Sequence, residues 1–214
     1  MAIVNGYCSK DDFKTAVTIS DTVDDTDIEQ AIETASRQID GIAGRGRKFW
    51  KDATVVARTY YPSESNRVWV DDIATLTGLI VKVDQDDDGT FETTLTINTD
   101  FIVEPINAAA EFPVRPYESI RLLNRSLGSF PCLSSGRPSV QVTATFGWSA
   151  VPDAIERACI NQAKTVFKGV DAQNDTVLVS AEGYAIRLPA VSTMTRVTLE
   201  PFVRYSEVDD RAHD

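Results

Sequence analysis

The feature that most constrains this chain is a change of periodicity that occurs twice along its 214 residues. Up to about residue 50, apolar side chains recur at helical spacing. From 53 to 148 short runs rich in Val, Ile, Thr and aromatic residues follow one another, and after residue 151 helical spacing returns. We therefore predict the α+β class, with a helical core and an inserted antiparallel β domain.

The expected helices lie at both ends of the chain. Apolar residues spaced alternately four and three positions apart predict a helix with one apolar stripe. They are Ile28, Ile32, Ala35, Ile39 and Ile42. Before it, Ser9 and Asp12 form a capping box with Asp in place of Glu, and Pro152 suits the first turn of a later helix. The sequence predicts helices at residues 9–18, 25–43, 152–168 and, if Pro201 begins or kinks it, 196–205.

The middle of the chain is predicted to be β structure. Its short runs, such as RVWV, LIVKV and TTLTI, are separated by Gly78, the Asp-Gly pair at 88–89 and Pro105. Regular turns between strands favour antiparallel hairpins in a small sandwich or barrel. We expect residues 53–148 to form this inserted domain, and residues 1–50 and 150–214 to form the helical core with an extended C-terminal segment.

Composition limits the classes of partner. The formal net charge of −11 opposes tight binding to nucleic acid and to an anionic membrane surface. The sequence has no apolar run of the roughly 18 residues that a membrane span needs and no signal peptide, so we expect a protein made in the cytoplasm. The three cysteines are odd in number and far apart, which predicts neither a disulfide framework nor a CxxC site.

Motifs of the common enzyme classes are missing from the sequence. The single histidine is His213, next to the last residue, which leaves no Ser-His-Asp or Cys-His set. A GxxxxGK[ST] phosphate loop is absent, and Gly44-x-Gly46 follows a helix rather than a strand. Carboxylates are plentiful, but the sequence selects no pair of them. We predict that the chain is not an enzyme.

One motif carries metal chemistry. Asp84, Asp86, Asp88 and Glu92 alternate with other residues around Gly89, between two expected strands. Calcium prefers such a spread of carboxylate oxygens on a tight turn. Position twelve is Leu95, so the motif is not an EF-hand. Two interpretations stay open, a calcium loop on a β-hairpin and a solvated acidic turn that binds nothing.

A small basic group follows the second helix. Arg45, Arg47 and Lys48 are candidates for contact with DNA in a channel or with an acidic partner. The alternative, which we favour, is a cationic helix end that complements the helix dipole. Three positive charges can neutralise only a few phosphates, which is little for a nucleic-acid binding site.

Several stretches in order resemble the head-tail connector (adaptor, or head-completion) proteins of long-tailed double-stranded DNA phages. They are NGYCSKDDFKTAV, DDTDIEQAIETASRQIDGIAGR, VDDIATLTGLIVKVDQDDDGTFETT and GWSAVPDAIERACINQAKTVFK. The likeness spans residues 4 to 168. This sequence departs from the pattern of the family at Gly46, which interrupts the end of the second helix, and from Gly169 onward.

The resemblance implies a helical connector core and a virion protein of the neck. It implies a ring of twelve copies beneath the portal protein that extends the channel for passing double-stranded DNA, without sequence-specific binding, and offers a platform to the next neck or tail-completion protein. The helix faces expected to build the ring carry Ile28, Ile32, Ile39, Ile155 and Val166.

Other functions remain as alternatives. One is another virion part, such as a tail-completion or tail-terminator protein. A second is a calcium-dependent binding module built on the Asp84 loop, and a third is a hydrolase that uses paired carboxylates. The long helices favour the connector, and the missing signal peptide disfavours the extracellular binding module.

Overall fold

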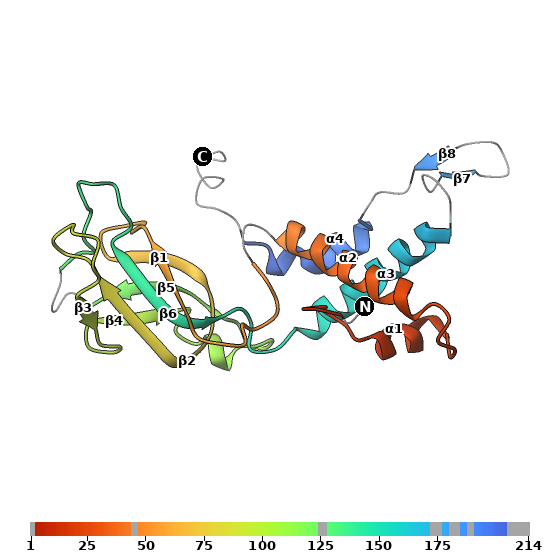
Figure 1. Cartoon of the computed structure of the whole chain (residues 1–214), viewed down its shortest axis with the longest axis horizontal. Helices are drawn as coiled ribbons and strands as arrows, with labels where there is room; N and C mark the ends of the chain where they lie inside the picture. The colour runs from red at the N-terminus through yellow and green to blue at the C-terminus, as the bar shows by residue number, and fades with distance from the viewer. Residues whose placement is uncertain are drawn as a thin grey trace. The chain divides into compact units, whose positions relative to one another are not determined.

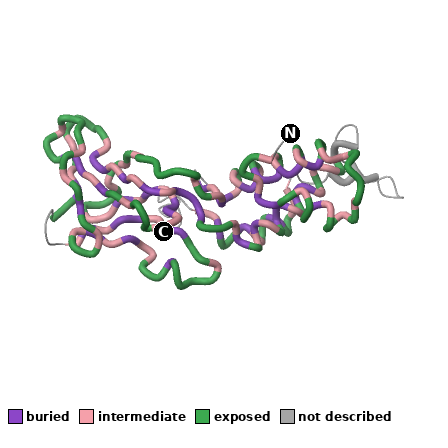
Figure 2. Tube along the Cα trace, turned by 60° about the horizontal axis from the view of Figure 1, so that its bottom comes forward, coloured by how far each residue is buried: buried purple, intermediate pink, exposed green. Residues whose placement is uncertain are grey.

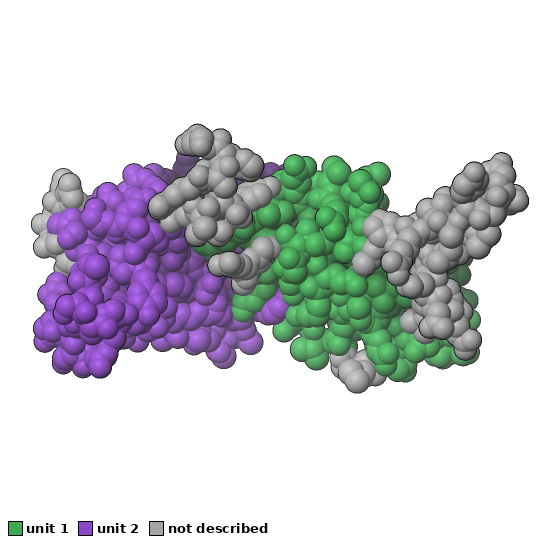
Figure 3. All heavy atoms as spheres, turned by 90° about the horizontal axis from the view of Figure 1, so that it is seen from above, with its two compact units in different colours: residues 1–49, 151–214 green, residues 50–150 purple. Residues whose placement is uncertain are grey.

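The structure is a computed structural model that describes residues 3–43, 47–123, 128–171, 177–179, 185–187 and 191–204. The chain divides into two compact units (Figures 1 and 3). Unit 1 is formed by both ends of the chain, Met1–Phe49 and Val151–Asp214, and unit 2 by the continuous stretch Trp50–Ala150.

Unit 2 is a six-stranded sheet in the order β1-β6-β2-β5-β4, with β3 paired to β2 (Figure 1). All of its strand pairs are antiparallel. Its strands are β1 (Val56–Tyr60), β2 (Arg67–Val83), β3 (Thr93–Leu95), β4 (Phe101–Glu104), β5 (Tyr117–Leu122) and β6 (Val140–Phe146), with a short 3-10 helix, η1 (Ala108–Ala110), between β4 and β5.

The 17-residue strand β2 organises the sheet. Its first part pairs with β5 and its second part with β6, and the register shifts between Ile73 and Thr75 and again between Thr75 and Ile80. Such irregularities bend a strand, which allows one strand to serve two neighbours along its length. Gly78 lies in this stretch with φ of +79°, a conformation that glycine adopts without steric cost.

Unit 2 has its own apolar core. Buried and partly exposed residues alternate along β6, as expected for a strand with one buried face, and its buried residues belong to one apolar cluster with those of β2 and β5. Figure 2 shows buried stretches of chain in both units. At the end of β6, the Trp148 indole Nε1 donates a hydrogen bond of 3.0 Å to the buried Asp72 carboxylate. This bond satisfies two polar groups that would otherwise be costly to bury.

Unit 1 contains the helices α1 (Lys10–Val17), α2 (Asp25–Ala43), α3 (Asp153–Asp171) and α4 (Thr193–Leu199), followed by a 3-10 helix, η2 (Glu200–Phe202). It also contains a strand pair, β7 (Val177–Val179) and β8 (Ala185–Arg187). The capping box is confirmed: Ser9 Oγ accepts from the Asp12 amide at 3.1 Å, and Asp12 Oδ2 accepts from the Ser9 amide at 3.3 Å. Ser192 caps α4 through a single bond, since its Oγ accepts from the Thr195 amide at 3.1 Å.

Helices α2 and α3 pack against each other through apolar faces. Ile28, Ile32, Ile39 and Ile155 are fully buried. Lysines of α1 hold the start of α2, because Lys10 Nζ and Lys14 Nζ lie 2.7 and 2.6 Å from the Asp25 carboxylate oxygens. The positions expected for these helices agree with α1, α2 and α3, whereas the expected helix at 196–205 is α4 followed by the 3-10 turn at Pro201.

The predicted fold class, a helical connector core that carries a β insertion, is wrong. In the described residues the principal structure is the antiparallel six-stranded sheet, accompanied by four α-helices, of which two have only 8 and 7 residues. The apolar stripe of α2 shows that this helix buries one face, but periodicity says nothing about how much of a fold a helix supports. Unit 2 has a core of its own and is not an appendage of the helices.

Candidate functional site

The acidic loop between β2 and β3 brings its carboxylates together. One carboxylate oxygen from each of Asp84, Asp86, Asp88 and Glu92 lies within 4.8 Å of the others. Asp84 is fully buried and is held by the loop backbone, since its two oxygens accept from the amides of Asp87 and Gly89, each at 2.9 Å. Glu92 reaches back to accept from the Gln85 amide at 3.0 Å.

The spacing of these oxygens suits a hard cation. Calcium binds oxygen at about 2.3–2.6 Å, so ligands on opposite sides of one ion lie roughly 4.6–5.2 Å apart. Four carboxylates so close together also repel one another, and a divalent cation would remove that repulsion. The loop is thus able to offer four oxygen ligands, of which Asp84 is preorganised.

Asp87, the remaining acid of this loop, has a role that the sequence spacing does not indicate. Asp87 has φ of +65° and its carboxylate accepts from Ser134 Oγ at 3.0 Å, from the Ser135 amide at 2.8 Å and from Ser135 Oγ. These hydrogen bonds from Ser135 lower the pKa of Asp87. Asp87 therefore ties the acidic loop to a distant segment of unit 2, a contact that sequence spacing does not reveal.

The basic group at the end of α2 is only partly described. Arg47 is buried, and its Nη1 donates a hydrogen bond of 2.8 Å to the Phe202 carbonyl, so this guanidinium serves the packing of η2. Lys48 is half-buried, and Arg45 lies outside the described residues. The prediction that these three residues contact DNA or a partner stays untested, and for Arg47 its buried position opposes it.

The helix faces predicted for ring contacts lie inside unit 1. Ile28, Ile32, Ile39 and Ile155 are fully buried within this one chain, and Val166 is half-buried. Their apolar surface is already covered by the neighbouring helices. Whether the helices take part in a ring stays a prediction, but any contact with another copy would use other side chains of α2 and α3.

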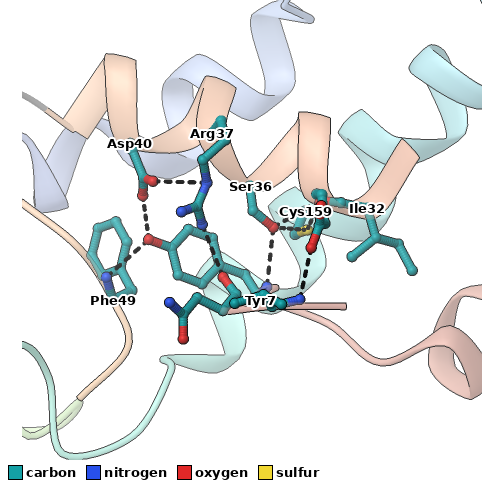
Figure 4. Close-up of polar contacts among 10 residues, drawn as sticks. Tyr7, Ile32, Ser36, Arg37, Asp40, Phe49 and Cys159 are labelled. Carbon is teal, nitrogen blue, oxygen red and sulfur yellow. Dashed lines mark hydrogen bonds and ion pairs between the residues drawn. The ribbon is translucent and has the colours of Figure 1, made fainter. Parts of the chain in front are cut away.

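A second cluster of polar groups joins the N-terminal segment to α2 and α3 (Figure 4). The Tyr7 hydroxyl donates to Asp40 and accepts from the Phe49 amide at 3.0 Å, while the Tyr7 amide donates to Ser36 Oγ at 3.1 Å. Arg37 holds the same segment through a bond of 2.9 Å from its Nη2 to the Asn5 carbonyl. Figure 4 shows these side chains between the N-terminal segment and the C-terminal half of α2.

The electrostatics of this cluster are those of a buried structural network. Burial, together with the hydrogen bond to Asp40, raises the pKa of Tyr7, and burial raises the pKa of Asp40. The Tyr7 ring packs edge-on against Phe49, with centroids 5.5 Å apart, and is almost fully buried. A tyrosine closed off in this way has no access to a substrate.

Cys8 and Cys159 meet next to this cluster. Their sulfur atoms are 3.5 Å apart, and Ser36 Oγ lies 3.4 Å from Cys159 Sγ. Cys159 is fully buried on α3, and its partner is 151 positions away along the chain, a pairing that sequence spacing does not indicate. In the described part of the chain no helix is both long enough and apolar enough to cross a membrane.

The fold of this chain is similar to that of chains from gene transfer agent (GTA) particles. No family model matches the sequence, and no curated protein is similar to it. The fold is similar to a chain from the neck of an empty GTA particle computed with C6 symmetry, with 16% identity, a TM-score of 0.55 and coverage of 97% of this chain and 95% of that one. It is also similar to a chain from the neck of a native GTA particle computed with C12 symmetry, with 15% identity, a TM-score of 0.53 and the same coverage.

A third similar chain comes from the virion of a native gene transfer agent (GTA) particle, with 17% identity, a TM-score of 0.51, and coverage of 97% of this chain and 95% of that one. At these identities the likeness shows the fold. It extends over both units and not over one of them alone, because almost the whole of each chain is covered.

Proposed function

We propose that this chain is a structural, non-enzymatic protein of the neck of a phage-like particle, where copies of it form a ring. The observation that carries the proposal is the likeness in fold, over 97% of the chain, to chains from the necks of gene transfer agent particles. Those necks were computed with C6 and C12 symmetry, which supports a ring of identical subunits.

Within the neck, we assign the chain to the position between the portal protein and the next neck or tail-completion protein, in twelve copies, after synthesis in the host cytoplasm. The charge of the chain favours a ring through which DNA passes over a ring that binds DNA. The net charge of −11 disfavours phosphate contacts, so double-stranded DNA would move past such a ring without being held. A ring also requires two different contact faces on each subunit.

Cryo-electron microscopy of particles purified from cells that produce this chain tests the proposal. The expected result is a closed ring of this chain beneath the portal, with both units fitted into each subunit. Density for the chain in the head shell or tail tip, or its absence from particles, would overturn it. A ring further down the neck would instead favour the alternative of a tail-completion or terminator protein.

A second proposal concerns the acidic loop, and the observation that favours it is the convergence of four carboxylate oxygens within 4.8 Å. We propose that Asp84, Asp86, Asp88 and Glu92 bind Ca²⁺ and stabilise unit 2. Because an ion that binds only the folded state stabilises that state, saturating Ca²⁺ should raise the unfolding temperature by several degrees.

The calcium proposal is tested by calorimetry of the purified chain with and without Ca²⁺. Replacing both Asp86→Asn and Asp88→Asn should abolish the rise, while Glu111→Gln, which changes an exposed acid elsewhere in unit 2, should retain it. Equal unfolding temperatures of the unmodified chain with chelator and with millimolar Ca²⁺ would show that the loop is a solvated turn.

A further inference from the structure

We propose that Cys8 and Cys159 are a covalent modification site, at which oxidation forms a disulfide that ties the N-terminal segment to α3. The geometry that carries this inference is the distance of 3.5 Å between the two sulfur atoms inside unit 1. A disulfide needs about 2.05 Å, so the sulfurs must approach by roughly 1.5 Å, a distance that rotation of side chains can supply. The proposal concerns the isolated chain and does not depend on a role in the neck.

The surroundings favour this pair over other thiol chemistry. The two sulfur atoms are 3.5 Å apart, so each thiol has the other as its neighbour. Cys8 is 7% exposed and Cys159 is fully buried, so a small oxidant reaches the pair only when the N-terminal segment opens. Cys132, in contrast, is exposed and belongs to unit 2. In the folded chain an intramolecular bond between Cys8 and Cys159 should therefore form in preference to mixed products, while Cys132 remains a free thiol.

The two cysteines lie at a structurally useful place. Cys8 directly precedes the Ser9 cap of α1, and the residues before it are held to α2 by the Tyr7 amide on Ser36 and by the Val4 amide on Glu33 Oε1 at 2.7 Å. The Tyr7 bond is buried, but the Val4 bond is exposed and competes with water. A covalent bond to α3 would keep the segment in place even when such bonds open.

The oxidant that we name is a low-molecular-weight disulfide, such as oxidised glutathione. One protein thiolate attacks a glutathione sulfur, which forms a mixed disulfide and releases one glutathione thiolate. The second protein thiolate then attacks the mixed disulfide and releases the second glutathione. Two protein thiols lose two protons and two electrons, and one glutathione disulfide becomes two thiols.

The reaction is expected to be slow in the folded chain. The hydrogen bond to Cys159 and burial both raise the pKa of Cys8, whereas the hydrogen bond from Cys8 lowers the pKa of Cys159. The more acidic thiol of the pair is therefore the fully buried one, which an oxidant reaches poorly in the folded chain. Reduced protein made in a cytoplasm would consequently keep the thiols, and the bond would form after prolonged exposure to an oxidising medium.

The test starts from the reduced full chain, incubated with oxidised glutathione, freed of reagent and unfolded for thiol counting with Ellman's reagent. Three thiols are expected before oxidation and one, Cys132, afterwards. Mass spectrometry should show the loss of two hydrogens and a cross-linked peptide pair containing residues 8 and 159. Closing so long a loop should also raise the unfolding temperature, by about 10 °C.

Two matched variants sharpen the result. Cys132→Ser should form the same cross-link. Cys8→Ala should form no disulfide within the chain: its two remaining thiols should stay reduced or carry glutathione. Persistence of three thiols after oxidation of the folded chain, a cross-link that includes residue 132, or a lowered unfolding temperature of the oxidised chain would each overturn the proposal. The comparison of reduced with oxidised chain needs no variant, so it stands even if Cys8→Ala fails to fold.

Discussion

Gly147 is the residue at which the backbone of unit 2 tolerates no side chain. It has φ of +107°, and a Cβ there would lie 1.9 Å from the Trp50 carbonyl oxygen. We expect Gly147→Ala to lower the free energy of unfolding by about 2–4 kcal/mol, because strain at positive φ adds to a clash with backbone that cannot move aside.

Urea denaturation of the purified variant checks this expectation. Gly136→Ala is the control, since Gly136 has φ of +72° but open space around the added methyl group. Its cost should be only about 1–2 kcal/mol, the cost of a left-handed conformation alone. Equal losses in the two variants would contradict the clash.

Trp148 combines a large buried ring with a hydrogen bond to buried Asp72. Trp148→Phe should lower the free energy of unfolding by about 1–3 kcal/mol, since the carboxylate loses a donor in a place that water reaches poorly. Trp69→Phe, at a half-buried position of β2, is the control and should cost less. Denaturation curves that are the same for both variants would show that the Asp72 bond contributes little.

At the scale of single residues, sequence reasoning succeeds where partners are close along the chain. Asp84, Asp86, Asp88 and Glu92 converge because one short loop carries them, and Ser9 finds Asp12 within one turn of helix. Asp87 and the pair Cys8 and Cys159 are different. Their partners come from segments that only the tertiary fold brings near, and no local spacing encodes that approach.

At the scale of elements, the junction between α1 and α2 depends on charge. Lys10 and Lys14 lower the pKa of Asp25, Lys10 having the larger effect. A carboxylate whose pKa is lowered on folding stabilises the folded state above its unfolded pKa of about 3.9 and loses that contribution as the pH falls through the folded value. Asp25→Asn should therefore be less stable than the unmodified chain at neutral pH, and the difference should vanish in acid.

Free energies of unfolding measured across the acidic range check this dependence. Asp27→Asn provides the control, because Asp27 is an exposed acid in the same first turn of α2 and shares the favourable position near the helix N-terminus. If Asp25→Asn and Asp27→Asn follow the same curve, the helix dipole and not the lysine pair accounts for the effect.

Strand β2 shows why element boundaries were harder to predict than element types. The runs RVWV and LIVKV were expected to be separate, with Gly78 as punctuation between them, and the structure joins them in one strand. Gly78 marks an irregularity inside the strand because both parts have sheet partners, β5 for the first and β6 for the second. Which strands pair is decided by the tertiary fold and cannot be derived from local sequence. Without that information the extent of the sheet was underestimated, and the predicted fold class was wrong.

At the scale of the whole molecule, assembly should depend on exposed apolar residues. In the connection between β4 and β5, Phe112 is 97% exposed and Ile106 is 69% exposed. An apolar side chain in this state is a candidate for burial against a neighbouring copy in the proposed ring. Phe112→Asp should leave the free energy of unfolding within about 0.5 kcal/mol but reduce incorporation into particles.

Incorporation is measured as the amount of this chain in purified particles when the variant is the sole copy supplied. Val23→Asp, which alters an 85% exposed residue between α1 and α2, is the control for loss of an exposed apolar group in general. Incorporation of Phe112→Asp at the level of the unmodified chain would remove this connection from the list of assembly contacts.

The division of the chain also dictates an order of folding during synthesis. Unit 2 is continuous, whereas unit 1 needs α2 and α3, which lie on either side of it in the sequence. A ribosome that adds roughly 5–20 residues per second needs on the order of ten seconds between finishing α2 and finishing α3. For that time the isoleucine face of α2 is covered only by the N-terminal segment and α1 and still lacks α3, so the nascent polypeptide offers chaperones a binding segment that disappears once the C-terminal part emerges.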